Sequence, residues 1–194
     1  MSIDPRAPEE NLIARVEVVA VNQLEEAIRA WFRYGDPASI HTLAAAANGC
    51  YHPLGAKQGI PTLVQAWINS LKPAERRAAR KAQNFFKHGP DRGETEVHFR
   101  PDHAALLIMD SIISHEKLFK KRTPLMTCFF ARFTFESPRL VEHINAVRRK
   151  EGRQDLVIEQ AGDTDRMQFL NRELPAVIAA IAAGEGGSLH DLPP

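Results

Sequence analysis

The stretch Leu106-Leu107-Ile108-Met109-Asp110-Ser111-Ile112-Ile113 decides the fold. Its apolar side chains would cover nearly every face of a helix, which is typical of a helix that is buried on all sides. Pro101 lies shortly before this stretch, and proline is favoured in the first turn of a helix. We therefore expect a central helix over residues 101–121, with the other elements packed around it.

Helical periodicity continues on both sides of this run, so the sequence predicts an all-α protein. The expected helices cover residues 20–34, 37–50, 64–71, 73–88, 101–121, 137–150 and 164–183. Residues 124–135 fit either a helix or a strand, and we favour a helix. The side chains expected on the apolar faces of the first four helices are Leu24, Ile28, Trp31, Phe32, Ile40, Leu43, Ala44, Ala47, Val64, Trp67, Ile68, Leu71, Ala78, Ala82, Phe85 and Phe86.

Two short segments between these helices are expected not to be helical. Residues 51–60 contain Pro53, Gly55 and Gly59, which predicts a loop. Residues 94–100 alternate between polar and apolar side chains, which predicts an extended segment or a short strand. The expected organisation is a flexible N-terminal segment (1–19), a helical bundle domain (20–150), a linker with a C-terminal helix (151–183) and a loose tail (184–194).

Composition restricts the classes of function. Hydrophobic residues make up 44% of the chain and charged residues 25%, as in ordinary globular proteins. The net charge of +1 gives no overall attraction to nucleic acid, so such binding needs a local patch. Cys50 and Cys128 form no CxxC pattern, which excludes a cysteine zinc site and fits a reducing compartment. The polar N-terminus and the lack of a long apolar run predict a cytoplasmic protein without a signal peptide or a membrane span.

The strongest local charge lies between Lys72 and Arg92, where seven Lys/Arg stand against two Asp/Glu, a balance of +5. Asn84 and His88 are four residues apart and would share a helix face, and histidine beside clustered cations can bind phosphate or transfer protons. Both are our catalytic candidates. The alternatives are a histidine that serves the helix C-terminus and a cationic face that is merely solvated. The predicted nucleic-acid-binding residues are Arg77, Arg80, Lys81, Lys87 and Arg92.

Two motifs resemble a known group of proteins. They are Ser39-Ile40-His41-Thr42-Leu43-Ala44-Ala45-Ala46-Ala47 and Asn84-Phe85-Phe86-Lys87-His88. Over roughly residues 22–135 the chain is similar to an uncharacterised group of bacterial all-helical proteins and to the wider HEPN superfamily. The resemblance implies a four-helix up-down bundle that is usually dimeric. It also implies the metal-independent ribonuclease activity that many HEPN proteins have.

The HEPN signature is an arginine, a polar residue, a few variable residues and a histidine. On this chain the polar residue matches Asn84 and the histidine matches His88, but the arginine position holds Gln83. Arg80 is the nearest arginine upstream and has a different spacing. Because glutamine carries no charge for the RNA phosphate, the resemblance supports the fold better than it supports cleavage.

His41 and Asp110 are candidates for a pocket in the bundle. His41 lies off the apolar stripe of its helix, which is more typical of a core-edge histidine bonded to a neighbour. Asp110 lies in the buried run, where a carboxylate must be paired or protonated. We expect a structural pair with a cation, and His103 is seven residues earlier on the same face. The sequence contains no spacing of ligands that predicts a metal site and no cofactor motif.

Three functional hypotheses follow from these patterns. The first is a dimeric HEPN-like protein that engages RNA, in which His88 would activate the ribose 2′-hydroxyl or protonate the leaving oxygen. The second is a non-catalytic helical scaffold or regulatory protein, whose C-terminal helix docks on a protein partner. The third is small-molecule binding in the core, near the Ala-rich second helix and Asp110.

Overall fold

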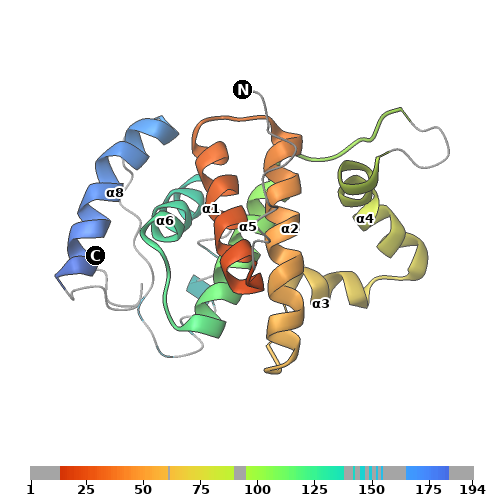
Figure 1. The fold of residues 1–194 in the computed structure, drawn as a ribbon, viewed down its shortest axis with the longest axis horizontal. Coiled ribbons are helices and arrows are strands. Elements are labelled where there is room, and N and C mark those ends of the chain that lie inside the picture. Colours follow the sequence, from red (N-terminus) through yellow and green to blue (C-terminus); the bar gives the residue numbers. More distant parts are fainter. Residues whose placement is uncertain are drawn as a thin grey trace, which may run out of the picture.

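The protein is all-helical in the computed structural model, which describes residues 14–60, 62–89, 95–137, 142, 145, 146, 149, 152, 154 and 165–183. Within these residues the chain forms seven helices and no strand (Figure 1). The helices are α1 (Val16–Phe32), α2 (Pro37–Ala56), α3 (Leu63–Ser70), α4 (Pro73–His88), α5 (Asp102–Phe119), α6 (Pro124–Glu136) and α8 (Arg166–Ala182).

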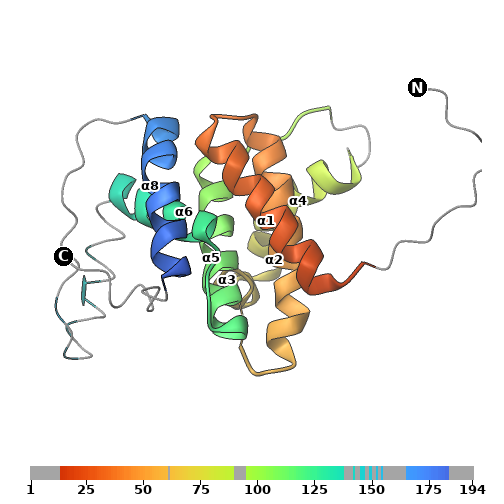
Figure 2. The same cartoon turned by 60° about the vertical axis from the view of Figure 1, so that its left-hand side comes forward.

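The expected central helix is confirmed as α5, which packs against α1, α2, α3 and α6. Ile108 and Ile112 are completely buried in it, together with Ser111. The apolar run therefore forms the middle of the core, with α6 and α8 at one end of the molecule and α4 at the other (Figures 1 and 2). No helix of the described part is both long and apolar enough to cross a membrane.

α1 and α2 form the helical pair that the sequence predicts. The turn between them holds Tyr34 in the left-handed region, with a φ of 52°. Asp36 then begins α2 as its N-cap: one carboxylate oxygen accepts hydrogen bonds from the Ser39 N–H and the Ser39 hydroxyl, both at 2.7 Å. Pro37 occupies the first helical turn, where its missing N–H costs nothing. The cap and the proline thus fix where the second helix starts.

α2 is longer than predicted. Residues 51–56 continue the helix, and Pro53 lies inside it, so the expectation of a loop over 51–60 holds only for its last part. Tyr51 is completely buried, and the packing of this side chain against the core keeps the backbone helical through a proline. Tertiary packing here outweighs the proline and glycine signals that predict the end of a helix.

Other expectations on the described helices have mixed outcomes. Residues 124–136 are helical, as we favoured, and residues 95–100 form neither helix nor strand, which excludes the short strand but not the extended segment. Trp67 was expected to face the core but is 55% exposed, because α3 is only eight residues long and buries Ile68 alone. Most of the helix expected over 137–150, the proposed tail and residues 1–13 lie outside the described residues. The first helix begins at Val16, so residues 16–19 of the expected N-terminal segment are helical.

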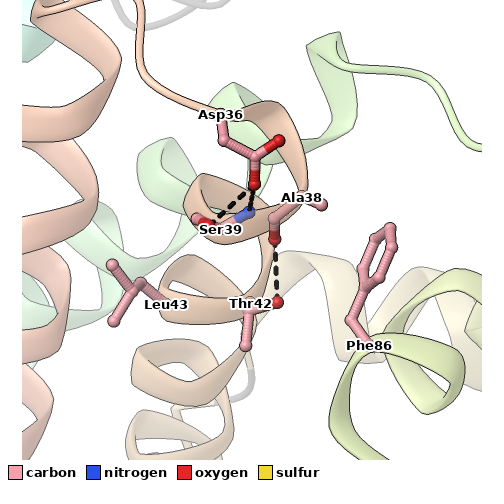
Figure 3. Close-up of a pocket in the computed structure, with 6 residues that line it drawn as sticks. All are labelled: Asp36, Ala38, Ser39, Thr42, Leu43 and Phe86. Carbon is pink, nitrogen blue, oxygen red and sulfur yellow. Dashed lines mark hydrogen bonds between the residues drawn. The ribbon is translucent and has the colours of Figure 1, made fainter. Parts of the chain in front are cut away.

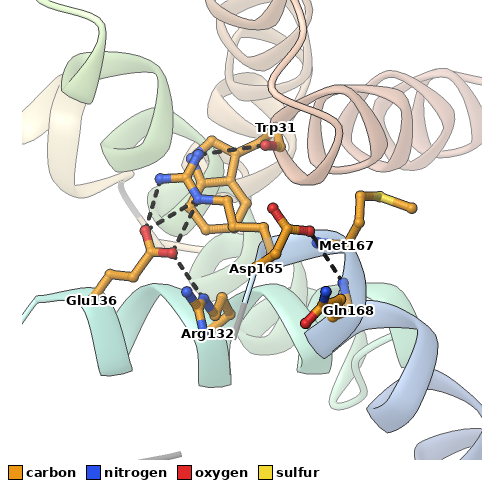
Figure 4. Close-up of polar contacts among 7 residues, drawn as sticks. Trp31, Arg132, Glu136, Asp165, Met167 and Gln168 are labelled. Carbon is orange, nitrogen blue, oxygen red and sulfur yellow. Dashed lines mark hydrogen bonds and ion pairs between the residues drawn. The ribbon is translucent and has the colours of Figure 1, made fainter. Parts of the chain in front are cut away.

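α8 is held by a partly buried ion cluster between it and α6 (Figure 4). The Glu136 carboxylate accepts hydrogen bonds from Arg166 Nη2 at 2.7 Å and from Arg132 Nε at 2.8 Å. The Arg166 guanidinium also lies 3.7 Å from the centroid of the Trp31 ring, which brings α1 into the cluster. Burial would raise the pKa of Glu136, but the bonds from Arg166 and Arg132 hold it below its usual range. The C-terminal helix is therefore part of the same packed body.

Gly55 gives a direct test of how α2 ends. Its carbonyl accepts hydrogen bonds from the N–H of Gln58 at 2.9 Å and of Ile60 at 2.8 Å. A Cβ on residue 55 would lie 2.1 Å from the Ile60 carbonyl oxygen, so the backbone would have to move. We predict that Gly55→Ala lowers the free energy of unfolding by about 1–3 kcal/mol, measured by denaturant titration.

The matched control is Gly49→Ala in the same helix. A Cβ there meets no atom within 4 Å, and alanine is the better helix former, so we expect a gain of up to about 1 kcal/mol. Equal effects of the two substitutions would show that the turn after α2 does not approach Gly55 in this way.

Candidate functional site

α4, which carries most of the predicted site residues, stands at the edge of the fold (Figure 1). The structure describes the whole helix, and none of its residues is buried. Arg76 and Arg80 attach it to α3. Arg76 Nη2 donates to the carbonyl oxygens of Asn69 at 3.1 Å and Leu71 at 3.2 Å, where α3 ends. Arg80 Nη2 lies 3.4 Å from Gln65 Oε1.

The remaining polar residues form a line on the outer side of α4. Arg77, Lys81, Asn84 and His88 are all exposed. Their spacings of four, three and four residues place them above one another on one helix face. Lys87 is also exposed but lies about a quarter turn away, on the side of Arg76 and Arg80. We call Arg77, Lys81, Asn84 and His88 the outer line. It contains both catalytic candidates, whereas Arg80 is half-buried toward α3 and Arg92 lies outside the described residues.

The inner side of α4 rests on an aromatic cluster. The Phe86 ring lies edge-on to the ring of Phe99, with 4.9 Å between centroids, and 5.4 Å from the ring of His41 on α2. Phe85 contacts Phe86 at 6.0 Å. Phe86 therefore faces the body of the protein, as the sequence predicts, whereas the ring contact of Phe85 is with its chain neighbour Phe86 and does not test the prediction; both side chains are half-buried.

His41 is part of this cluster and not of a polar site. It is 6% exposed, and its Nδ1 atom has no hydrogen-bond partner among the described residues. The expected bond to a neighbour is therefore absent at that atom. Burial lowers the pKa of His41, with a smaller effect from His103. Its ring neighbours are aromatic, and neither His88 nor Asp110 is one of them.

A hollow of about 500 Å³ lies between the start of α2 and α4 (Figure 3). Its polar groups are already engaged: Asp36 caps α2, and the Thr42 hydroxyl donates to the Ala38 carbonyl oxygen at 2.8 Å. None of the predicted site residues lines it. Its lining residues are Asp36, Ala38, Ser39, Thr42, Leu43 and Phe86.

Asp110 binds the start of a helix, whereas we expected it to pair with a cation. Its Oδ1 accepts the Leu63 N–H at 2.7 Å and its Oδ2 the Val64 N–H at 3.0 Å, at the first turn of α3. Asn48 Nδ2 on α2 donates to Oδ2 at 2.9 Å. Helix N-termini present free N–H groups and a partial positive charge, which suit a carboxylate. The Thr62 hydroxyl accepts the Gln65 N–H at 3.3 Å and completes the cap.

Asp110→Asn tests this arrangement, because an amide offers one acceptor oxygen where the carboxylate offers two. We predict a loss of about 2–4 kcal/mol in the free energy of unfolding, from unsatisfied N–H groups at the start of α3. Asp36→Asn is the matched control, since asparagine caps a helix about as well as aspartate. If the Asp110 and Asp36 variants unfold at the same denaturant concentration, Asp110 does not act as the cap of α3.

Sequence reasoning missed a second buried polar pair. The Tyr51 hydroxyl lies 3.1 Å from His115 Nδ1, which joins α2 to α5, and His115 is 4% exposed. Its Nε2 atom has no partner among the described residues. Burial lowers the pKa of His115 to about 4, Lys121 adds to this, and Glu25 and Glu116 oppose it. The sequence did not predict this pair, because Tyr51 lies in residues 51–60, which we expected to form a loop.

This pair makes stability depend on pH. His115 is neutral in the folded protein and has an ordinary pKa of 6.5 when unfolded, so the unfolded chain binds more protons between these values. The stability it contributes is full above pH 6.5 and is lost as the pH falls toward 4. We predict that His115→Asn makes unfolding free energy less dependent on pH in this window, by up to about 1.4 kcal/mol per pH unit.

Denaturant titrations of both proteins across that window measure the difference. Parallel pH profiles for the wild type and the His115→Asn variant would contradict a neutral, buried His115.

The described residues contain no group of three or more His, Cys, Asp or Glu side chains that could hold a metal ion. Comparisons with protein-family models, with curated proteins and with solved structures found no match.

Proposed function

We propose that this protein binds RNA through the outer line of α4, as a HEPN-like helical protein that forms a dimer. The observation that carries the proposal is a helix with no buried residue and with three exposed cations, Arg77, Lys81 and Lys87. Clustered lysine and arginine side chains attract nucleic-acid phosphates and release their counterions. From Lys72 to His88 there are six Lys/Arg and one Glu, so the local charge is well above that of the whole chain.

The positions of the α4 side chains support RNA binding better than they support RNA cleavage. Asn84 and His88 lie among the cations of the outer line, where a phosphate or a ribose hydroxyl could reach them. Gln83, at the arginine position of the HEPN signature, is uncharged and half-buried. A nuclease would therefore need charge stabilisation from another group, such as Lys87 or a residue of a second subunit.

A protein scaffold remains the second candidate, and α8 carries the observation that favours it. Ile178 and Ile181 near its end are 49% and 43% exposed. Removing the whole C-terminal helix is a poor test of this alternative, because it would also remove Arg166 and the buried Phe169 and Leu170. Point substitutions at Ile178 and Ile181 leave the packed half of α8 intact.

The proposal is tested by RNA binding with the full chain and a fluorescent single-stranded RNA. We predict that changing Arg77, Lys81 and Lys87 together to glutamine weakens binding at least about tenfold, because three phosphate contacts are lost. The same preparation shows whether RNA is cleaved without metal and whether His88→Ala abolishes the cleavage.

The control changes Arg15, Arg33 and Lys57 to glutamine, three exposed cations that flank α1 and follow α2, and alters the net charge equally. Equal affinity of the two triple variants would contradict a role for α4. A wild-type protein that does not bind RNA would favour the scaffold. Cleavage that survives in His88→Ala would remove His88 from any catalytic role.

A further inference from the structure

We infer that a second copy of this chain docks on α8, so that two α8 helices pair in parallel along one mainly apolar stripe. The inference specifies the dimer of the proposed function, on which it rests, and it is tested without RNA. Three features of α8 carry it: the spacing of the stripe, the exposure of its side chains, and the absence of charge along its edges.

The stripe follows the heptad pattern of a coiled coil. Its members are alternately four and three residues apart, a spacing that keeps them on one side of a helix. They are Met167, Asn171, Leu174, Ile178 and Ile181, and we call these five residues the α8 seam. Asn171 and Ile178 then hold the a positions of a coiled coil, and the other three residues hold the d positions.

The C-terminal part of the seam is open to solvent. Ile178 and Ile181 are 49% and 43% exposed, and Asn171 is exposed as well. Met167 and Leu174 pack in part against the core of their own chain. The seam therefore lies beside the packed side of α8, where a second helix could reach it without displacing α6.

Within α8, no charged side chain lies at the positions that border the seam. These positions hold Gln168, Pro175 and Ala182 on one edge, and Leu170 and Val177 on the other. In coiled coils, charges at the bordering positions select the partner and its orientation. Two copies of α8 meet without a like-charge contact, whereas a partner with charged borders would leave its charges unpaired. A second copy is therefore the complementary occupant of the seam.

Asn171 favours the parallel direction. In a parallel pair the a positions of the two helices face each other, so the two Asn171 amides meet and can hydrogen-bond. In an antiparallel pair each amide would lie against apolar side chains without such a partner, which is destabilising. A single asparagine at an a position also fixes the register of a pair, at some loss of stability.

The seam is short, so the dimer is weak. From Met167 to Ile181 it covers two heptads, which is about 21 Å at the usual helical rise. A strip of this length and of one helix's width provides less than the about 800 Å² per partner of a stable interface. We expect dissociation in the micromolar range. Because α8 and α4 lie at opposite ends of the molecule, pairing leaves the α4 helices of both copies free (Figure 1).

The first experiment is sedimentation equilibrium of the full chain from low micromolar to submillimolar concentration. We expect a reversible equilibrium of monomer and dimer that NaCl does not weaken, because the seam carries no charge. Ile178→Asp is expected to raise the dissociation constant at least about tenfold, since it buries a charge in the interface. Ala176→Asp is the matched control: it adds the same charge at an exposed position on the other side of α8 and should change the constant less than about twofold.

Two substitutions of Asn171 complete the test. Asn171→Ile removes the cost of burying an amide and should strengthen association, a gain that misfolding cannot produce. Asn171→Cys should form a disulfide between two copies under mild oxidation, because parallel pairing brings the two residues within bonding distance. The wild type, which contains Cys50 and Cys128, is oxidised in parallel as the control.

Four results would overturn the inference. They are a protein that stays monomeric over the whole range, an Ile178→Asp variant that associates like the wild type, weaker association of Asn171→Ile, and the absence of a disulfide in Asn171→Cys. A monomer would leave the seam to a different protein, as in the scaffold candidate. A monomer that still binds RNA would remove the dimer but not the role of α4, and a dimer that binds no RNA would do the reverse, so the two failures are distinguishable.

Discussion

The carboxylate of Asp110 lies in the middle of the central helix α5 and is 3% exposed. A charge in such a place is strongly destabilising unless donors surround it. Here the donors are the first two N–H groups of α3 and the amide of Asn48. The start of α3 is thereby fixed to α5 and α2, although α3 buries only one apolar side chain. Arg76 and Arg80 then tie α4 to α3, so this acid contributes to the position of the basic helix, together with the contact of Phe86 with His41 on α2.

This chain of attachments explains why α4 is a good candidate for ligand binding. It is held at its ends and along its inner side by hydrogen bonds and aromatic contacts, none of which buries a residue completely. Arg77 and Lys81 lie on another face of the helix, the outer line. The polar groups inside the bundle, by contrast, are used for structure: Asp110 caps α3, and His115 bonds Tyr51. Glu136 joins α6 to α8. The core near Asp110 thus offers no unused carboxylate for a small molecule.

Much of the architecture could be predicted from local signals. α4 begins at Pro73 and ends at His88 as expected, because a proline at the first position and Gly89, with a φ of 78°, are strong boundary signals. The burial of Ile108 and Ile112 followed from an apolar run that covers nearly every face of its helix, although Leu106 in the same run is 49% exposed. The extension of α2 through Pro53 was not predictable, because it depends on where Tyr51 packs. The partner of Asp110 was not predictable either, since backbone N–H groups have no signature in a sequence.

The most direct test of this account is the hydrogen-exchange rate of the Leu63 and Val64 amides, measured by NMR in the native protein. First-turn N–H groups of a short helix have no partner within the helix and normally exchange fast. The account predicts that these two amides are protected as strongly as those of α5, and that both lose protection in Asp110→Asn. Fast exchange of Leu63 and Val64 in the wild type would contradict it.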